Sequence, residues 1–88
     1  MNKTIPNYDR IESTIVEKLF HYGCWGKGHL LTIRLNKGIP PEDVGHVDKV
    51  LKELIKNKII LIKKTKHGIA TFLNHGNRRK IDEIRIRE

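Results

Sequence analysis

A long amphipathic segment stands directly before two β-rich runs, and this order constrains the fold more than any other feature of the sequence. From Val44 to Ile55, apolar residues recur mainly at spacings of three and one, which is typical of one broad apolar helix face. The isoleucine-rich run that follows, and a second run after Gly68, are rich in β-forming residues and flank a short turn. The sequence therefore predicts a helix over residues 41–57 and an antiparallel hairpin over residues 59–73.

Shorter elements are predicted on both sides of this unit. An apolar stripe at Ile11, Ile15 and Leu19 indicates an N-terminal helix that packs one face on a core. This helix is predicted over residues 10–22, with a capping box at Asp9 and Glu12. A brief strand at 29–31 and a short helix from Thr32 to Lys37, capped by Thr32, are predicted next. The chain is predicted to end in a helix from Arg78 to Glu88, with a strand at 84–87 as the alternative.

The chain is expected to form a single domain over residues 1–88, with an ordered core at about residues 9–86. Its 88 residues, 38% of them hydrophobic, provide for one small core. The one cysteine, Cys24, cannot form an internal disulfide, and the longest aliphatic run is far shorter than the roughly 18 residues that span a bilayer. The N-terminus carries no apolar signal segment. We therefore expect no membrane association and a reducing, cytoplasmic location.

Basic residues are concentrated in one part of the chain. The formal net charge is +8, from 18 Lys and Arg against 10 Asp and Glu. Residues 58–80 contain seven Lys or Arg, and no carboxylate occurs between Glu53 and Asp82. A one-sided positive field attracts a polyanion, most often a nucleic acid. Taken alone, the same charge also fits a basic surface that only keeps the protein in solution.

The order of the predicted elements is a helix, a small strand, a short helix, a tight turn, a longer helix and a hairpin. This order resembles the winged helix-turn-helix superfamily, and more narrowly small archaeal winged-helix proteins of undefined role. The motifs that carry the resemblance are Trp25-Gly26-Lys27-Gly28-His29, Asn36-Lys37-Gly38-Ile39-Pro40, Lys63-Lys64-Thr65-Lys66-His67-Gly68 and Leu73-Asn74.

The resemblance covers about residues 10–86 and implies an α+β fold. That fold has three helices, a small antiparallel sheet with a β-hairpin wing, and a short C-terminal helix. It also implies that residues 41–57 form the recognition helix and residues 59–73 form the wing. Such proteins place the recognition helix in the major groove of DNA, where a helix fits.

The candidate site is the basic surface that this arrangement implies. We expect double-stranded DNA as the partner, with the recognition helix in the major groove and the wing on the flanking backbone or in the minor groove. A role as a transcriptional regulator or a chromatin-associated factor follows. The predicted DNA-binding residues are His46, Lys49, Lys52, Lys56, Lys63, Lys64, Lys66, His67, Arg78, Arg79 and Lys80.

Acidic residues near the start of the predicted recognition helix bear on specificity. Glu42, Asp43 and Asp48 stand where base-reading proteins usually place Arg, Asn, Gln or Ser, and none of Arg, Asn and Gln occurs between Gly38 and Lys56. We therefore expect binding dominated by phosphate contacts and DNA shape. The mixed charge also leaves two alternatives open: a winged helix that binds a protein within larger nucleic-acid machinery, and an RNA-binding module.

Motifs for metal binding and catalysis give weaker signals. His21, Cys24 and His29 are three possible metal ligands, but structural zinc sites usually use paired cysteine knuckles, so we expect no metal or other cofactor. Residues 23–26 match the GXXG loop of KH domains, although Cys and Trp there fit a packed corner better. No catalytic motif occurs, and we do not expect an enzyme. The isoleucines of segment 81–86 leave a homodimer open.

Overall fold

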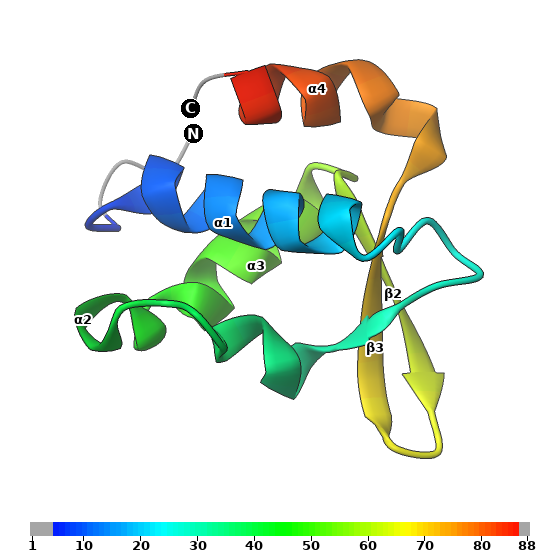
Figure 1. The fold of residues 1–88 in the computed structure, drawn as a ribbon, viewed down its shortest axis with the longest axis horizontal. Helices are drawn as coiled ribbons and strands as arrows, with labels where there is room; N and C mark the ends of the chain where they lie inside the picture. The colour runs from blue at the N-terminus through cyan, green and yellow to red at the C-terminus, as the bar shows by residue number, and fades with distance from the viewer. Residues whose placement is uncertain (1–4, 87–88) are drawn as a thin grey trace.

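The computed structural model describes residues 5–86, and within that range it is an α+β structure with a three-stranded antiparallel sheet (Figure 1). The strand order in the sheet is β1-β3-β2. In chain order the elements are α1 (Tyr8–His21), β1 (Leu30–Leu31), the 3-10 helix η1 (Thr32–Asn36), α2 (Pro41–Val44), α3 (Val47–Lys56), β2 (Ile60–Thr65), β3 (Gly68–Leu73), the 3-10 helix η2 (His75–Asn77) and α4 (Arg78–Ile86).

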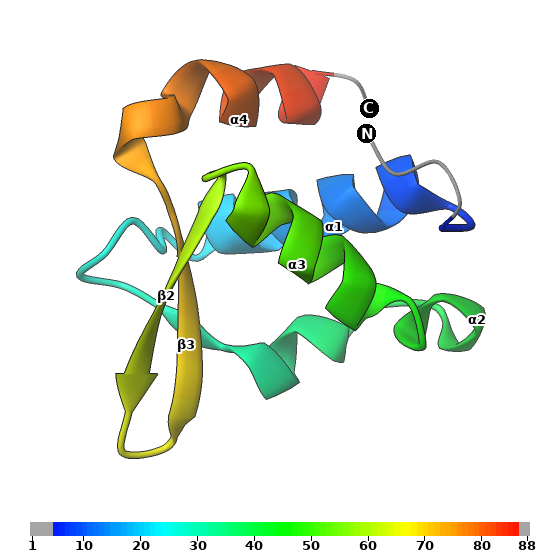
Figure 2. The same ribbon diagram turned by 180° about the vertical axis from the view of Figure 1, so that it is seen from behind.

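One core joins the apolar faces of the three longer helices to one face of the sheet. α1 contacts α3, α4 and β3. Figures 1 and 2 show α4 at one end of the molecule and the tip of the β2–β3 hairpin at the opposite end. The fully buried apolar side chains include Ile11, Ile15, Leu19, Leu35, Val50, Leu54, Ile60, Leu73 and Ile81.

The first helix begins earlier than predicted and without the predicted capping box. Its N-cap is Asn7, which has a left-handed backbone with φ 56° and makes no side-chain capping hydrogen bond. The Asn7 amide is instead committed to Asp43, at 3.0 Å. Asp9 lies within the first turn, where its charge suits the helix dipole, and Glu12 is buried. The predicted capping box is therefore wrong, because the helix begins before Asp9 and Asp9 is a residue of its first turn rather than its N-cap.

The helix predicted over residues 41–57 is interrupted. The chain leaves the helical pattern at Gly45 and His46, and this separates α2 from α3. Asp43 is buried and hydrogen-bonded to Arg10 of α1, so α2 is attached to α1 while α3 packs its own apolar face on the core. Glycine is a poor residue within a helix, which lowers the cost of a break at this point.

The end of α3 directs the chain straight into β2. The Ile59 N–H donates to Leu54 O at 3.0 Å, and the Lys58 N–H donates to Ile55 O at 3.1 Å. This pair of bonds is a Schellman motif, in which the residue after the C-cap has a left-handed backbone. Lys58 takes that position with φ 61°, where glycine is usual. The predicted helix end at Asn57 and Lys58 is confirmed.

The predicted hairpin is confirmed, with a loop of two residues. β2 pairs with β3 from Ile60 opposite Leu73 to Thr65 opposite Gly68, so that only Lys66 and His67 connect the strands. The Thr65 hydroxyl donates to Gly68 O at 2.7 Å and accepts the His67 N–H at 3.2 Å. The tip is therefore tied to the strands by side-chain hydrogen bonds as well as by the sheet.

Between α1 and α2, the predicted strand is confirmed, and the predicted short helix is a 3-10 helix, which is wound more tightly than an α-helix. β1 pairs with β3, as antiparallel neighbours. The predicted short helix from Thr32 to Lys37 is a 3-10 helix that ends at Asn36 and has no side-chain cap. The Lys18 ammonium donates to Leu35 O at 3.3 Å and to Lys37 O, which satisfies carbonyls at its end. Burial, and then the charge of Lys37, lower the pKa of Lys18.

The C-terminal segment is a helix as far as Ile86, and the strand alternative at 84–87 is wrong over the residues that the structure describes. Residues 87–88, which the predicted helix included, lie outside the residues that the structure describes. Ile81 and Ile84 are buried in the core of the monomer, whereas Ile86 is 80% exposed. Two of the three isoleucines considered for a dimer contact are thus already used within the monomer.

Candidate nucleic-acid interface

A stripe of lysines runs along the outer face of α3. Lys49, Lys52 and Lys56 are exposed, and their spacing of three and four residues places them on one side of the helix. Val50 and Leu54 are fully buried on the opposite side. Figure 2 shows α3 in front of α1. Because Val50 and Leu54 face the core, the exposed lysines lie on the opposite side of α3.

The acidic residues of this region divide between the interior and the surface. Asp43 is buried, while Glu42 and Asp48 are exposed and Glu53 is partly buried beside the lysine stripe. Burial opposes ionisation of Asp43, but hydrogen bonds from Arg10 and Asn7 and the Arg10 charge outweigh it, so the pKa of this carboxyl lies below its ordinary value. His46, directly before α3, is partly buried. One of the three acids near the helix start is therefore structural.

The two adjacent lysines of β2 point to opposite faces of the hairpin. The Lys63 ammonium donates to Gly26 O at 3.3 Å and lies 5.7 Å from the centre of the Phe72 ring. Successive side chains alternate along a strand, so Lys64 shares the other face with Ile62, which is 47% exposed. Lys63 and Lys64, both predicted to contact DNA, therefore cannot make equivalent contacts with one DNA surface.

The hairpin tip lies beside the segment that follows β1. Lys66 and His67 are exposed, and together with Arg34 of η1 and His29 they line a pocket of about 500 Å³. Sequence reasoning did not include Arg34 or His29 among the site residues. The pairing of β1 with β3 brings them to the tip, and two residues of strand give almost no sequence signal for that pairing.

The basic residues at the start of α4 lie at the other end of the molecule from the hairpin tip (Figures 1 and 2). Arg78, Arg79 and Lys80 are all exposed. The Arg78 guanidinium is already in use, because it lies 5.0 Å from the Trp25 ring centre and pairs with Asp82 at 3.2 Å. The structure therefore separates this group from the tip residues.

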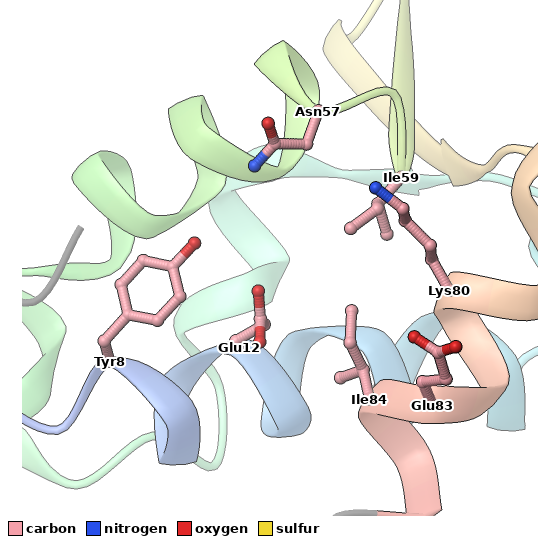
Figure 3. A pocket seen from close by; sticks show the side chains of 7 residues that line it. All are labelled: Tyr8, Glu12, Asn57, Ile59, Lys80, Glu83 and Ile84. Atoms are coloured by element: carbon pink, nitrogen blue, oxygen red, sulfur yellow. The ribbon is translucent and has the colours of Figure 1, made fainter. Parts of the chain in front are cut away.

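Lys80 also shares a pocket with carboxylates. A cavity of about 490 Å³ lies between α1, the end of α3 and α4, and in Figure 3 the Lys80, Glu12 and Glu83 side chains point into it. Tyr8 and Asn57 form part of the same lining. Two acids beside one lysine reduce the attraction of this region for a polyanion.

An aromatic cluster fixes the loop between α1 and β1. Trp25 stacks on His75 with ring centres 4.6 Å apart, and Phe20 meets its edge at 5.8 Å. The Arg85 guanidinium lies 3.5 Å from the Phe20 ring centre and pairs with Glu17 at 2.5 Å. Trp25 is partly buried against the core, as predicted for a packed corner. The loop joins a helix to a strand, whereas a KH loop joins two helices.

Over residues 5–86, no three His, Cys, Asp or Glu side chains gather closely enough to hold a metal ion, so His21, Cys24 and His29 form no such group. In the same range, no helix combines the length and apolar character needed to cross a bilayer.

Comparison with known proteins gave no match. Neither a protein-family model, nor a curated protein, nor a solved structure matches this chain. Function is therefore inferred from the charged surface and its chemistry.

Proposed function

We propose that this chain binds double-stranded DNA as a winged helix-turn-helix domain, in the role of a transcriptional regulator or a chromatin-associated factor in the cytoplasm. α3 would lie in the major groove, and the β2–β3 hairpin would be the wing on the flanking backbone. The chain order of the helices and the sheet order β1-β3-β2 support this assignment. The observation that carries it is the exposed lysine stripe of α3, followed by a hairpin whose tip is basic.

The proposed interface is narrower than the full set of basic residues. It consists of the α3 stripe (Lys49, Lys52 and Lys56) with Lys64 and Lys66 of the hairpin, and His46 and His67 at its margins. Lys63 is turned toward Gly26 O and the Phe72 ring, Arg78 is held by Trp25 and Asp82, and Lys80 shares a pocket with two carboxylates. We therefore assign these residues, and Arg79 between them, general attraction rather than direct contacts.

Binding is proposed to depend on phosphates more than on base edges. Asp43 is held inside the protein, and Glu42 at the start of the recognition segment would repel phosphate or meet a cytosine amino group. Lysines, rather than residues capable of bidentate base contacts, occupy the exposed face. If five to seven phosphates are contacted, the logarithm of the association constant should fall with the logarithm of the salt concentration, at a slope of about −4 to −6.

Two charge-matched double variants test the proposal by fluorescence anisotropy with a labelled duplex. Lys64→Ala with Lys66→Ala should weaken binding about 10-fold or more, since two phosphate contacts are lost. Arg79→Ala with Lys80→Ala removes the same charge from α4 and should weaken binding by no more than about 3-fold. Equal losses would mean that only net charge matters, and no binding at 50 mM salt would overturn the proposal. Competition with duplex RNA separates DNA from RNA binding.

A protein partner is the second candidate, because residues 33–48, which lead into the lysine stripe, include exposed acids and an exposed isoleucine. Glu42 and Asp48 are exposed, and Ile33 of η1 is 76% exposed. Mixed charge with apolar side chains suits a protein surface better than a phosphate backbone. Failure of the duplex to bind at low salt would favour this candidate.

A further inference from the structure

The pocket at the hairpin tip combines fixed cations, titratable imidazoles and an apolar wall. Arg34 and Lys66 are exposed and line it together with His29 and His67. Leu30 and Leu31 supply its apolar wall. Among the described residues that line the pocket, the ionisable side chains are these two cations and two histidines, and none is acidic.

We propose that this pocket binds one sugar–phosphate unit of the DNA backbone, and that protonation of His29 and His67 strengthens the grip. The inference rests on the proposed DNA binding and adds that protonation of the pocket regulates its affinity. A phosphate needs convergent N–H donors and positive charge, which Arg34 and Lys66 supply. A deoxyribose has apolar edges, which the two leucines can cover.

The walls of the pocket are held at a fixed separation by one sheet. On one side, the Thr71 hydroxyl of β3 donates to Leu30 O at 2.8 Å, and β1 pairs with β3 at Leu31 opposite Ala70. On the other side, Thr65 ties the two-residue tip to its own strands. A site whose walls are ordered in advance loses less entropy when it binds a ligand.

The direction of the pH effect follows from the negative charge of a bound phosphate, since the other charged groups of the lining, Arg34 and Lys66, are cations. Histidine is the side chain whose charge ordinarily changes between pH 5 and 8, and the protonated ring has two N–H donors. A phosphodiester keeps its single negative charge over that range, so a bound phosphate favours the protonated rings. By reciprocity of linkage, protonation favours the phosphate, and affinity should rise as pH falls.

Duplex binding at pH 8.0 and pH 5.5, at constant ionic strength, tests the proposal. The parent protein should bind about 10-fold more tightly at pH 5.5, a typical coupling between two linked sites. The His29→Gln, His67→Gln double variant should lose most of that gain in affinity between pH 8.0 and pH 5.5. His21→Gln changes an exposed histidine of α1 that is not part of the pocket lining, and it should retain the gain.

A second variant tests the fixed cations. Arg34→Gln should weaken duplex binding several-fold at both pH values, as loss of one phosphate contact requires. A full pH gain in the double histidine variant, or an unchanged affinity in Arg34→Gln, would overturn the pocket proposal while leaving DNA binding by α3 intact.

Titration with dimethyl phosphate, followed by NMR amide shifts, separates this proposal from the proposed function. If the duplex fails to bind but dimethyl phosphate shifts Arg34 and Lys66 resonances more strongly at pH 5.5, the pocket is an anion site and the DNA assignment is wrong. If neither ligand perturbs these residues, the pocket proposal is wrong, and if the duplex also fails to bind at 50 mM salt, the DNA assignment is wrong with it.

Discussion

Arg10 of α1 donates two hydrogen bonds to one carboxylate oxygen of Asp43 in α2, with Nη2 and Nε at 2.6 and 3.0 Å from Oδ2. Asn7 donates to the other oxygen at 3.0 Å. Asp43 is only 1% exposed, so these partners compensate a charge that burial would otherwise disfavour. These hydrogen bonds attach α2, which precedes the proposed recognition helix α3, to the first helix.

Replacing Asp43 with Asn should lower the midpoint of thermal unfolding by about 5–10 °C at pH 7, because the half-exposed Arg10 loses its charged, buried partner. The pKa of Asp43 is lowered in the folded state, so its stabilising effect is present above the ordinary value of 3.8 and is lost as pH falls through the lower folded-state pKa. The parent and the variant should therefore converge at strongly acidic pH, as followed by circular dichroism.

Glu42→Gln provides the matched control, because Glu42 is the exposed neighbour of Asp43. It should change the unfolding midpoint at pH 7 by no more than a few degrees. A similar loss in both variants would show that the Arg10–Asp43 contact does not stabilise the fold.

Replacing Lys58 with Gly should raise the free energy of unfolding by about 0.5–1 kcal/mol, because a left-handed backbone strains any residue with a Cβ atom. Lys58 has φ 61°, and the hydrogen bonds it accepts, from Asn74 Nδ2 at 2.7 Å and Asn77 Nδ2 at 3.3 Å, use only its backbone oxygen. Urea unfolding measures the change. Lys58→Ala removes the same charge but keeps Cβ, so a gain in that variant would contradict the backbone explanation.

Replacing Arg85 with Ala should lower the free energy of unfolding by about 1 kcal/mol, the usual size of a cation–π contact with a partly buried ring. The guanidinium lies 3.5 Å from the Phe20 ring centre and also pairs with Glu17. Trp25, the one tryptophan of the chain, stands 5.8 Å from Phe20 and reports the loss through its fluorescence in urea. Arg79→Ala, on an exposed position of the same helix, should leave stability unchanged within about 0.5 kcal/mol.

Replacing Lys64 with Ala should weaken duplex binding about 5- to 10-fold, whereas Lys63→Ala should have an effect of less than about 2-fold. The two variants remove the same charge from adjacent positions, but Lys63 is turned toward Gly26 O and the Phe72 ring. Anisotropy titrations at a single salt concentration compare them. Equal weakening would mean that both faces of the hairpin attract DNA, or that neither makes a direct contact.

Local patterns in the sequence predicted the elements that depend on near neighbours. Helical spacing identified the apolar face of α3, and β-forming residues around Gly68 identified the hairpin. The end of α3 at Asn57 was also predicted, although the left-handed backbone of Lys58 was not, because glycine or asparagine is expected there.

The features that the sequence did not predict depend on partners far along the chain. The break before α3 reflects the contact of Asp43 with Arg10, which is 33 residues away in sequence. Arg34 reaches the hairpin tip through the pairing of β1 with β3, and Arg78 is held by Trp25 and Asp82. Counting charge along the chain found the basic residues but could not say which of them share a face.

The sheet order β1-β3-β2 makes β2 an outer strand, with one row of its backbone N–H and C=O groups unpaired within the sheet. Such an edge is a template for strand pairing between molecules, and lysines on it are a common protection against aggregation. Lys63 and Lys64 occupy this edge. We therefore expect the same two lysines that are tested for DNA binding to oppose strand pairing between molecules, and their alanine variants to self-associate more readily through β2.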